Sequence, residues 1–66
     1  MRLFYKQRLG PSLLYGENSW VVRRKDTEKF LDYHKRWVKY REDAKIFDKH
    51  RAALLVWELN RGGDLG

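Results

Sequence analysis

The feature that most constrains this 66-residue chain is the stretch from Asp26 to Asn60, which contains neither proline nor glycine. Apolar residues recur along it at alternating spacings of three and four, which is the period of an amphipathic helix. These residues are Phe30, Tyr33, Trp37, Tyr40, Ala44, Phe47 and Leu54. The stretch therefore predicts one long C-terminal α-helix over 26–61, followed by a flexible tail over 62–66.

Both ends of this stretch carry helix signals. Asp26 offers a side-chain oxygen to the unpaired amides of a first helical turn. Asn60, Arg61 and the glycine pair after them are typical of a helix end. Asp32 and Arg36 have the four-residue spacing of a helical ion pair.

The apolar side of the predicted helix changes direction along its length. Phe30 and Trp37 define one direction on a helical wheel, whereas Ala53 and Trp57 point nearly the opposite way. Either the helix bends or breaks near 41–44, giving a helical hairpin, or a second subunit or partner encloses its C-terminal half. The lack of a helix-breaking residue favours one continuous helix.

The residues before this stretch have the pattern of an antiparallel β-ribbon. Met1 to Leu9 alternates with period two, and Trp20 to Lys25 begins with aromatic and β-branched residues. Turn sequences end the first segment and precede the second, while 13–15 is either a short strand or a packed loop. The predicted fold class is α+β: an N-terminal antiparallel hairpin or three-stranded meander (1–25) and the C-terminal helix, in one domain over 1–66.

So short a chain buries little apolar surface, and its core needs a supplement. The absence of cysteine excludes disulfides and thiolate zinc sites. His34 and His50 have no third ligand at a metal-binding offset, so we expect no metal and no cofactor. Self-association as a homodimer or other homo-oligomer, or binding to a larger protein partner, is the expected supplement.

Several functional classes do not fit the sequence. The longest apolar run, Ala52 to Trp57, is far shorter than the ~20 residues of a membrane span. The N-terminal residues lack the apolar region of a secretory signal, so we expect a cytoplasmic, intracellular protein. With no phosphate-binding glycine loop and too little chain to enclose a pocket, we expect no catalysis and no small-molecule substrate.

The net charge of +6 predicts a polyanionic partner. Residues 1–25 hold most of the excess positive charge, because this segment contains six cations and one acid, Glu17. Lysine and arginine displace counterions from phosphates, and a ring such as Phe4 can stack on a base or lie against a sugar. The predicted surface for DNA or RNA comprises Arg2, Phe4, Lys6, Arg8, Arg23, Arg24 and Lys25. Depending on strand register, the face of Phe4 also carries either Trp20, Val22 and Arg24 or Val21, Arg23 and Lys25.

Other interpretations stay open. Cations at strand edges also discourage aggregation, and an aromatic stripe on a helix is also what core packing requires. The alternative function is a protein-directed inhibitor or adaptor that docks its aromatic helix onto a larger enzyme or assembly. Its predicted protein interface comprises Phe30, Tyr33, Trp37, Tyr40, Phe47, Leu54 and Trp57.

Overall fold

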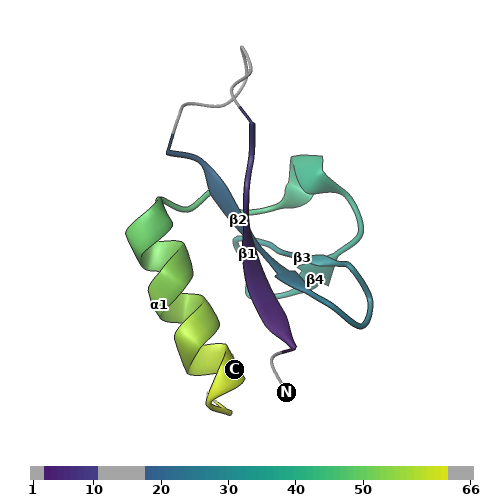
Figure 1. The fold of residues 1–66 in the computed structure, drawn as a ribbon. Helices are drawn as coiled ribbons and strands as arrows, with labels where there is room; N and C mark the ends of the chain where they lie inside the picture. Colours follow the sequence, from purple (N-terminus) through teal and green to yellow (C-terminus); the bar gives the residue numbers. More distant parts are fainter. Residues whose placement is uncertain (1–2, 11–17, 63–66) are drawn as a thin grey trace.

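The computed structural model describes residues 3 to 10 and 18 to 62, and it has an α+β fold. Its elements, in chain order, are β1 (Phe4–Arg8), β2 (Trp20–Arg24), β3 (Phe30–Leu31), β4 (Trp37–Val38), the 3₁₀ turn η1 (Arg41–Asp43) and α1 (Lys49–Asn60). The four strands form one antiparallel sheet in the order β1-β2-β3-β4, with α1 packed against it (Figure 1). The predicted fold class, an N-terminal antiparallel sheet followed by one C-terminal helix, is confirmed. The possible strand over 13–15 and most of the predicted tail lie outside the described residues.

The structure corrects the start of the helix from Asp26 to Lys49. Asp48 is the residue that caps it, because its Oδ1 accepts a hydrogen bond from the backbone N–H of Arg51 at 2.7 Å. Asp26 lies instead in the turn after β2. Residues 26–48 form neither the continuous helix nor the helical hairpin that we predicted. The predicted helix end is confirmed, since α1 stops at Asn60 and Gly62 has a φ of 92°.

Residues 26–47 form strands and turns because their apolar side chains serve both faces of the sheet. Phe30 packs with Leu9 and Val21 in one cluster, whereas the adjacent Leu31 packs with Val22 in the other. A single helix would place these apolar residues on one side and leave the other face of the sheet uncovered. Alternation between two faces is a property of strands, and aromatic residues favour them.

The aspartate–arginine pair predicted for the helix exists, but a hairpin turn forms it. Asp32 Oδ1 accepts hydrogen bonds from the backbone N–H groups of His34 and Arg36, both at 2.8 Å. The Arg36 side chain lies 3.5 Å from the other carboxylate oxygen. The turn also holds Lys35 at a φ of 60°. Asp32 therefore organises the β3–β4 connection.

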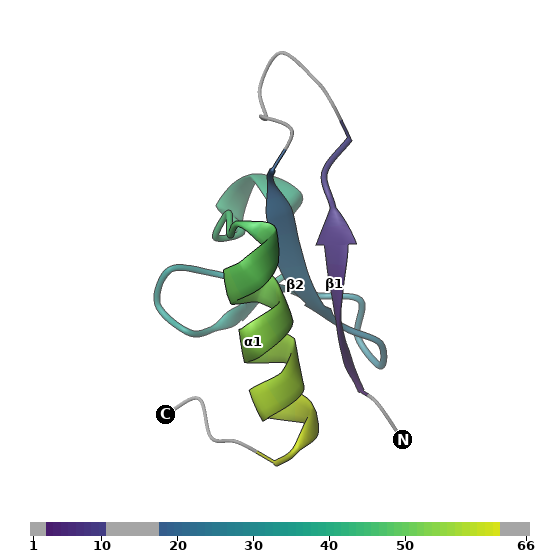
Figure 2. The same cartoon turned by 60° about the vertical axis from the view of Figure 1, so that its left-hand side comes forward.

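The segment between η1 and α1 fixes where the helix begins. Phe47 exchanges two backbone hydrogen bonds with Trp20, each of 2.8 Å. The backbone N–H of Lys49 donates to Asn18 Oδ1 at 3.0 Å. The first turn of α1 consequently lies beside the start of β2, and the helix then runs across the sheet toward β1 (Figure 2). Among the described residues, no helix has the length and apolar character to cross a bilayer.

Candidate nucleic-acid interface

The strand register determines which basic residues share a face. Phe4 pairs with Arg24, Lys6 with Val22, and Arg8 with Trp20. Directly opposed residues in antiparallel strands point to the same side, so these six side chains share one face. Val22 packs there against Ala52 and Leu59 of α1. Of the two registers that the sequence allowed, the structure has the one that places Trp20, Val22 and Arg24 on the face of Phe4. We call this side of the sheet the α1 face.

Three cations gather around Trp20 at one end of the α1 face. The Nζ of Lys6 lies 5.7 Å from the centroid of the indole ring, and the Nζ of Lys49 lies 6.0 Å from it. Arg8 is the cross-strand neighbour of Trp20. None of the three cations forms an ion pair with a carboxylate of the described residues. We call Lys6, Arg8, Trp20 and Lys49 the Trp20 cluster.

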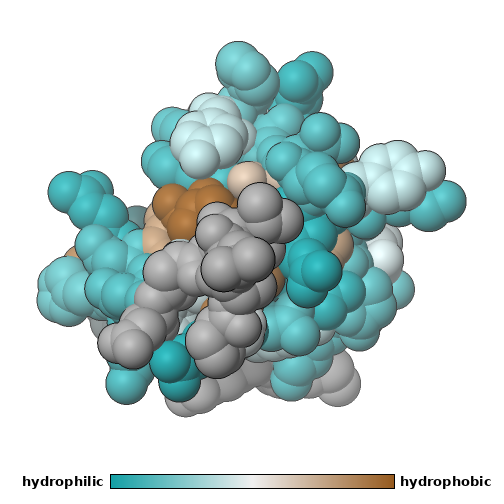
Figure 3. Space-filling view, turned by 90° about the horizontal axis from the view of Figure 1, so that it is seen from above, coloured by the Kyte–Doolittle hydropathy of each residue, from teal (hydrophilic) through white to brown (hydrophobic). Residues whose placement is uncertain are grey.

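The Trp20 cluster lies toward the end of the molecule where β2 and α1 begin. Figure 3 views the molecule from this end. Apart from the grey residues, most of the surface seen there is hydrophilic, with a small apolar area near the centre. Cations that have no carboxylate partner in the described part of the chain and lie on a polar surface are what a polyanion contacts.

The other end of the α1 face is occupied by contacts within the protein. The rings of Phe4 and Trp37 stack with centroids 5.6 Å apart, and Phe4 packs against the core under α1. The Arg24 guanidinium lies 5.7 Å from the Phe4 ring and 5.5 Å from the Trp37 ring. It also donates two hydrogen bonds to Asp26, at 3.1 and 2.9 Å. Partial desolvation acts to raise the pKa of the Asp26 carboxyl, but the hydrogen bonds and charge of Arg24 outweigh it and lower that pKa.

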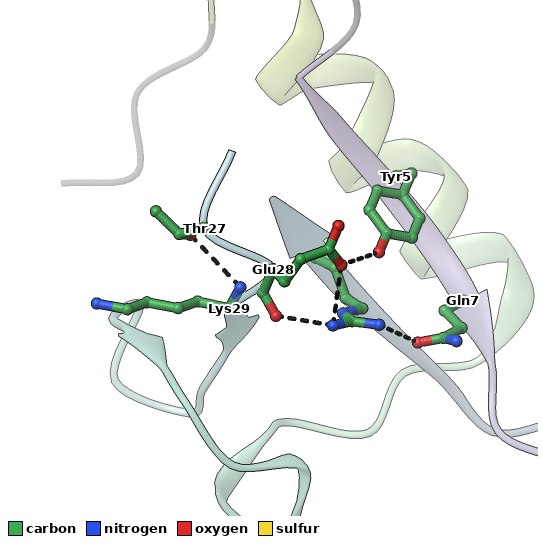
Figure 4. A network of polar contacts seen from close by, with 6 residues as sticks. Tyr5, Gln7, Thr27, Glu28 and Lys29 are labelled. Carbon is green, nitrogen blue, oxygen red and sulfur yellow. Dashed lines mark hydrogen bonds and ion pairs between the residues drawn. The ribbon is translucent and has the colours of Figure 1, made fainter. Parts of the chain in front are cut away.

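Arg23 points to the opposite face. There it joins a polar network with Tyr5, Gln7 and Glu28, which are labelled in Figure 4. Its guanidinium donates to Gln7 Oε1 at 3.0 Å and to the Glu28 carbonyl at 2.8 Å, and pairs with the Glu28 carboxylate at 3.0 Å. The Tyr5 hydroxyl donates to the same carboxylate at 2.8 Å. Desolvation and this hydrogen bond raise the pKa of the Tyr5 hydroxyl. The Arg23 guanidinium also lies 4.4 Å from the Phe30 ring, so it connects β1, β2 and the turn before β3.

The remaining predicted cations are not part of the Trp20 cluster. Lys25 is exposed in the turn after β2, and its backbone N–H donates to the Leu3 carbonyl at 2.8 Å, at the far end of the ladder. Arg2 lies outside the described residues. The structure therefore brings together Lys6 and Arg8 from the predicted set and separates them from Arg23, Arg24 and Lys25.

The seven predicted protein-interface residues fall into three groups. Phe30 and Phe47 are buried in the core, and Trp37 is half-buried on Phe4. The other four are exposed by 52 to 64%: Tyr33, Tyr40, Leu54 and Trp57. An open groove of about 340 Å³ between α1 and the β3–β4 hairpin includes Tyr33, Phe47 and Leu54 in its lining.

Two members of the Trp20 cluster, Lys49 and Trp20, were not among the residues predicted to bind nucleic acid. Trp20 was assigned only to a possible strand face, and Lys49 was hidden inside a predicted helix with nearly balanced charge. Asp48, three residues before Arg51 and just ahead of the apolar run from Ala52, is the signal that could have shown where the helix starts.

The described residues contain no group of three or more histidine, aspartate or glutamate side chains that could hold a metal ion. Comparison with protein-family models, with curated proteins and with solved structures finds no match.

Proposed function

We propose that this protein binds nucleic acid by contacting phosphates with Lys6, Arg8 and Lys49. The observation that carries the proposal is the gathering of these cations around Trp20, free of ion pairs with described carboxylates. Each cation that neutralises a phosphate releases condensed counterions, and this release favours binding. Arg23 and Arg24 contribute less, because carboxylates within the protein already neutralise them.

The aromatic contacts favour backbone contact over base recognition. Ammonium groups already lie over the Trp20 ring, and the Phe4 ring already stacks on Trp37. A base would have to displace these partners in order to stack. Binding should therefore depend little on nucleotide sequence, since phosphate contacts carry no sequence information directly.

An anisotropy titration with a labelled 20-mer, as duplex and as single strand, tests the proposal. Three phosphate contacts give a slope of about −2.7 for log affinity against log salt on duplex DNA. The triple variant Lys6→Ala, Arg8→Ala, Lys49→Ala should bring this slope close to zero. The matched control Lys25→Ala, Lys29→Ala, Lys39→Ala removes three exposed lysines elsewhere and should keep most of the slope. Absence of binding at low salt, or equal loss in both triple variants, would overturn the proposal.

A second candidate function is supported by the outer side of α1. Leu54 and Trp57 are 52 and 56% exposed there, although both are large apolar residues. Large exposed apolar side chains favour a protein contact, either with a second copy of this chain or with a larger enzyme or assembly. The groove beside Leu54 offers a place for an apolar side chain of the partner.

Sedimentation of the wild-type protein and of the variant Leu54→Ser, Trp57→Ser tests self-association. A wild-type oligomer that becomes monomeric in the variant supports this candidate. For a larger partner, a pull-down with and without nuclease distinguishes a direct protein contact from a nucleic-acid tether. Retention after nuclease in the wild type, with loss in the double variant, is the result expected of a protein-directed adaptor.

A further inference from the structure

The outer edge of β1 presents backbone groups in a regular order. The Leu3 carbonyl accepts from Lys25 N–H, and Leu9 N–H donates to the Ser19 carbonyl, so residues 3 and 9 point their backbone groups toward β2. In an antiparallel ladder this direction alternates from one residue to the next. The N–H and C=O groups of Phe4, Lys6 and Arg8 therefore point away from β2. Because β1 is the first strand of the sheet, they point toward its open edge.

One end of this edge is closed by the side chain of Asn60. Its Oδ1 accepts a hydrogen bond from the Phe4 N–H, and its Nδ2 donates to the Phe4 carbonyl, both at 3.0 Å. A carboxamide that bonds both groups of one residue takes the place of a neighbouring strand. The two outward residues after Phe4, Lys6 and Arg8, have no such partner among the described residues.

The side chains beside the open part of the edge indicate what it can accept. Lys6 and Arg8 place their cations on the α1 face, with Lys49 nearby. A second copy of β1 pairing edge to edge would set lysine and arginine against lysine and arginine, and directly opposed like charges destabilise a sheet. An extended segment with acidic residues on that face would instead place opposite charges across the new ladder.

We propose that the β1 edge over Lys6 to Arg8 binds an extended, acidic segment of a partner protein as an additional strand. Main-chain hydrogen bonds to the outward N–H and C=O groups of Lys6 and Arg8 hold the segment. Alternate carboxylates of the segment contact the Lys6 and Arg8 side chains. The proposal rests on the backbone of β1, so it does not require nucleic-acid binding to be correct.

A ten-residue peptide that alternates threonine and glutamate is a suitable probe. On adding it, the backbone amides of Lys6 and Arg8 should exchange with solvent more slowly in NMR measurements. A control peptide of the same sequence is N-methylated at its four central residues. It keeps the charge but has no central N–H donors on either side of the extended chain, so it should not slow this exchange. A peptide with lysine in place of glutamate should not bind. Equal protection by the N-methylated peptide would overturn the proposal, as would protection of Lys6 and Arg8 by self-association without peptide.

A pair of variants at Arg8 separates strand pairing from simple charge attraction. Arg8→Thr removes the cation and keeps the outward N–H, whereas Arg8→Pro removes both. Proline is tolerated on edge strands where the N–H faces outward. Thermal unfolding measurements verify that both variants fold. Arg8→Pro should weaken binding of the acidic peptide about threefold to tenfold more than Arg8→Thr, the effect of one backbone hydrogen bond. Both variants should weaken nucleic-acid binding equally, and equal effects on the peptide would overturn strand addition.

Discussion

At the scale of single residues, Lys6 and Arg23 show that a positive charge is not enough to define a binding residue. Both belong to the β1–β2 hairpin and both were predicted to contact phosphates. The Lys6 side chain has no carboxylate partner among the described residues, whereas Arg23 is paired with Glu28 and bonded to Gln7. The difference arises because strand alternation sends the two side chains to opposite faces.

We expect Arg23→Ala to lower the free energy of unfolding by about 1 to 2 kcal/mol, because it removes hydrogen bonds to a carboxylate and a carbonyl. We expect a loss of unfolding free energy near the lower end of this range, because Glu28 is largely exposed and water screens the ion pair. Urea unfolding measures it. The control Lys29→Ala, an exposed residue in the same turn, should stay within about 0.5 kcal/mol of the wild type. Equal stability of the two variants would contradict a structural role for Arg23.

Asp32 gives the molecule a pH dependence. Hydrogen bonds from the backbone N–H groups of Arg36 and His34, with the charge of Arg36, lower the pKa of its carboxyl below the ordinary 3.8, against an opposing effect of desolvation. The unfolded chain therefore binds this proton at a higher pH than the folded protein. The stabilisation is complete above the unfolded pKa and disappears as pH falls through the folded pKa. Asp32→Asn should reduce the loss of stability in urea unfolding between pH 6 and 2.5, and parallel profiles for both proteins would contradict this.

At the scale of elements, the apolar residues between Phe30 and Tyr40 have a helical period, but the helix predicted from that period does not form. Spacings of three and four between Phe30, Tyr33, Trp37 and Tyr40 have the period of a helix. In the structure, Phe30 and Trp37 lie on two paired strands and point to opposite faces of the sheet, because Phe30 pairs with Val38 and Trp37 pairs with Leu31. Period alone cannot separate these cases when strands are two residues long. Which partners cover each face is decided by tertiary packing.

The β1 and β2 strands and the end of α1 were predictable because each depends on local signals. Alternation predicted the first strand, aromatic and β-branched residues predicted the second, and the glycine after Arg61 marked the helix end. The Trp20 cluster was not predictable, because it depends on Phe47 pairing with Trp20 and bringing Lys49 alongside. That contact joins residues far apart in the chain.

The two candidate capping residues provide a direct test of where the helix begins. Asp48→Ala should lower the free energy of unfolding by about 1 kcal/mol, because it leaves the Arg51 N–H without its side-chain acceptor. Asp26→Ala removes an exposed ion pair with Arg24, so its effect on the free energy of unfolding should be smaller than that of Asp48→Ala. Far-UV circular dichroism during urea unfolding measures both. A larger loss of stability in Asp26→Ala than in Asp48→Ala would favour a helix that begins at Asp26.

At the scale of the whole molecule, Asn60 closes the fold by joining the last helix to the first strand. Its carboxamide bonds the Phe4 N–H and C=O across a separation of 56 residues. Both groups are partly buried, so losing the carboxamide leaves a donor and an acceptor poorly solvated. Leu59, the last buried residue of α1, belongs to the core cluster against which Phe4 packs, so the carboxamide reinforces an apolar contact between the same two elements.

We therefore expect Asn60→Ala to lower the free energy of unfolding by about 1 to 3 kcal/mol and to speed hydrogen exchange at Phe4. Asn18→Ala is a matched control, because the Asn18 side chain accepts one exposed hydrogen bond, from Lys49 N–H, and should cost about 1 kcal/mol or less. The variant Asn60→Ala also lengthens the open edge of β1 to include Phe4. It should consequently bind the acidic peptide more tightly even though it is less stable. A general loosening of the fold would instead lower both the peptide affinity and the free energy of unfolding. Weaker peptide binding in this variant would show that Asn60 supports the edge rather than closing it.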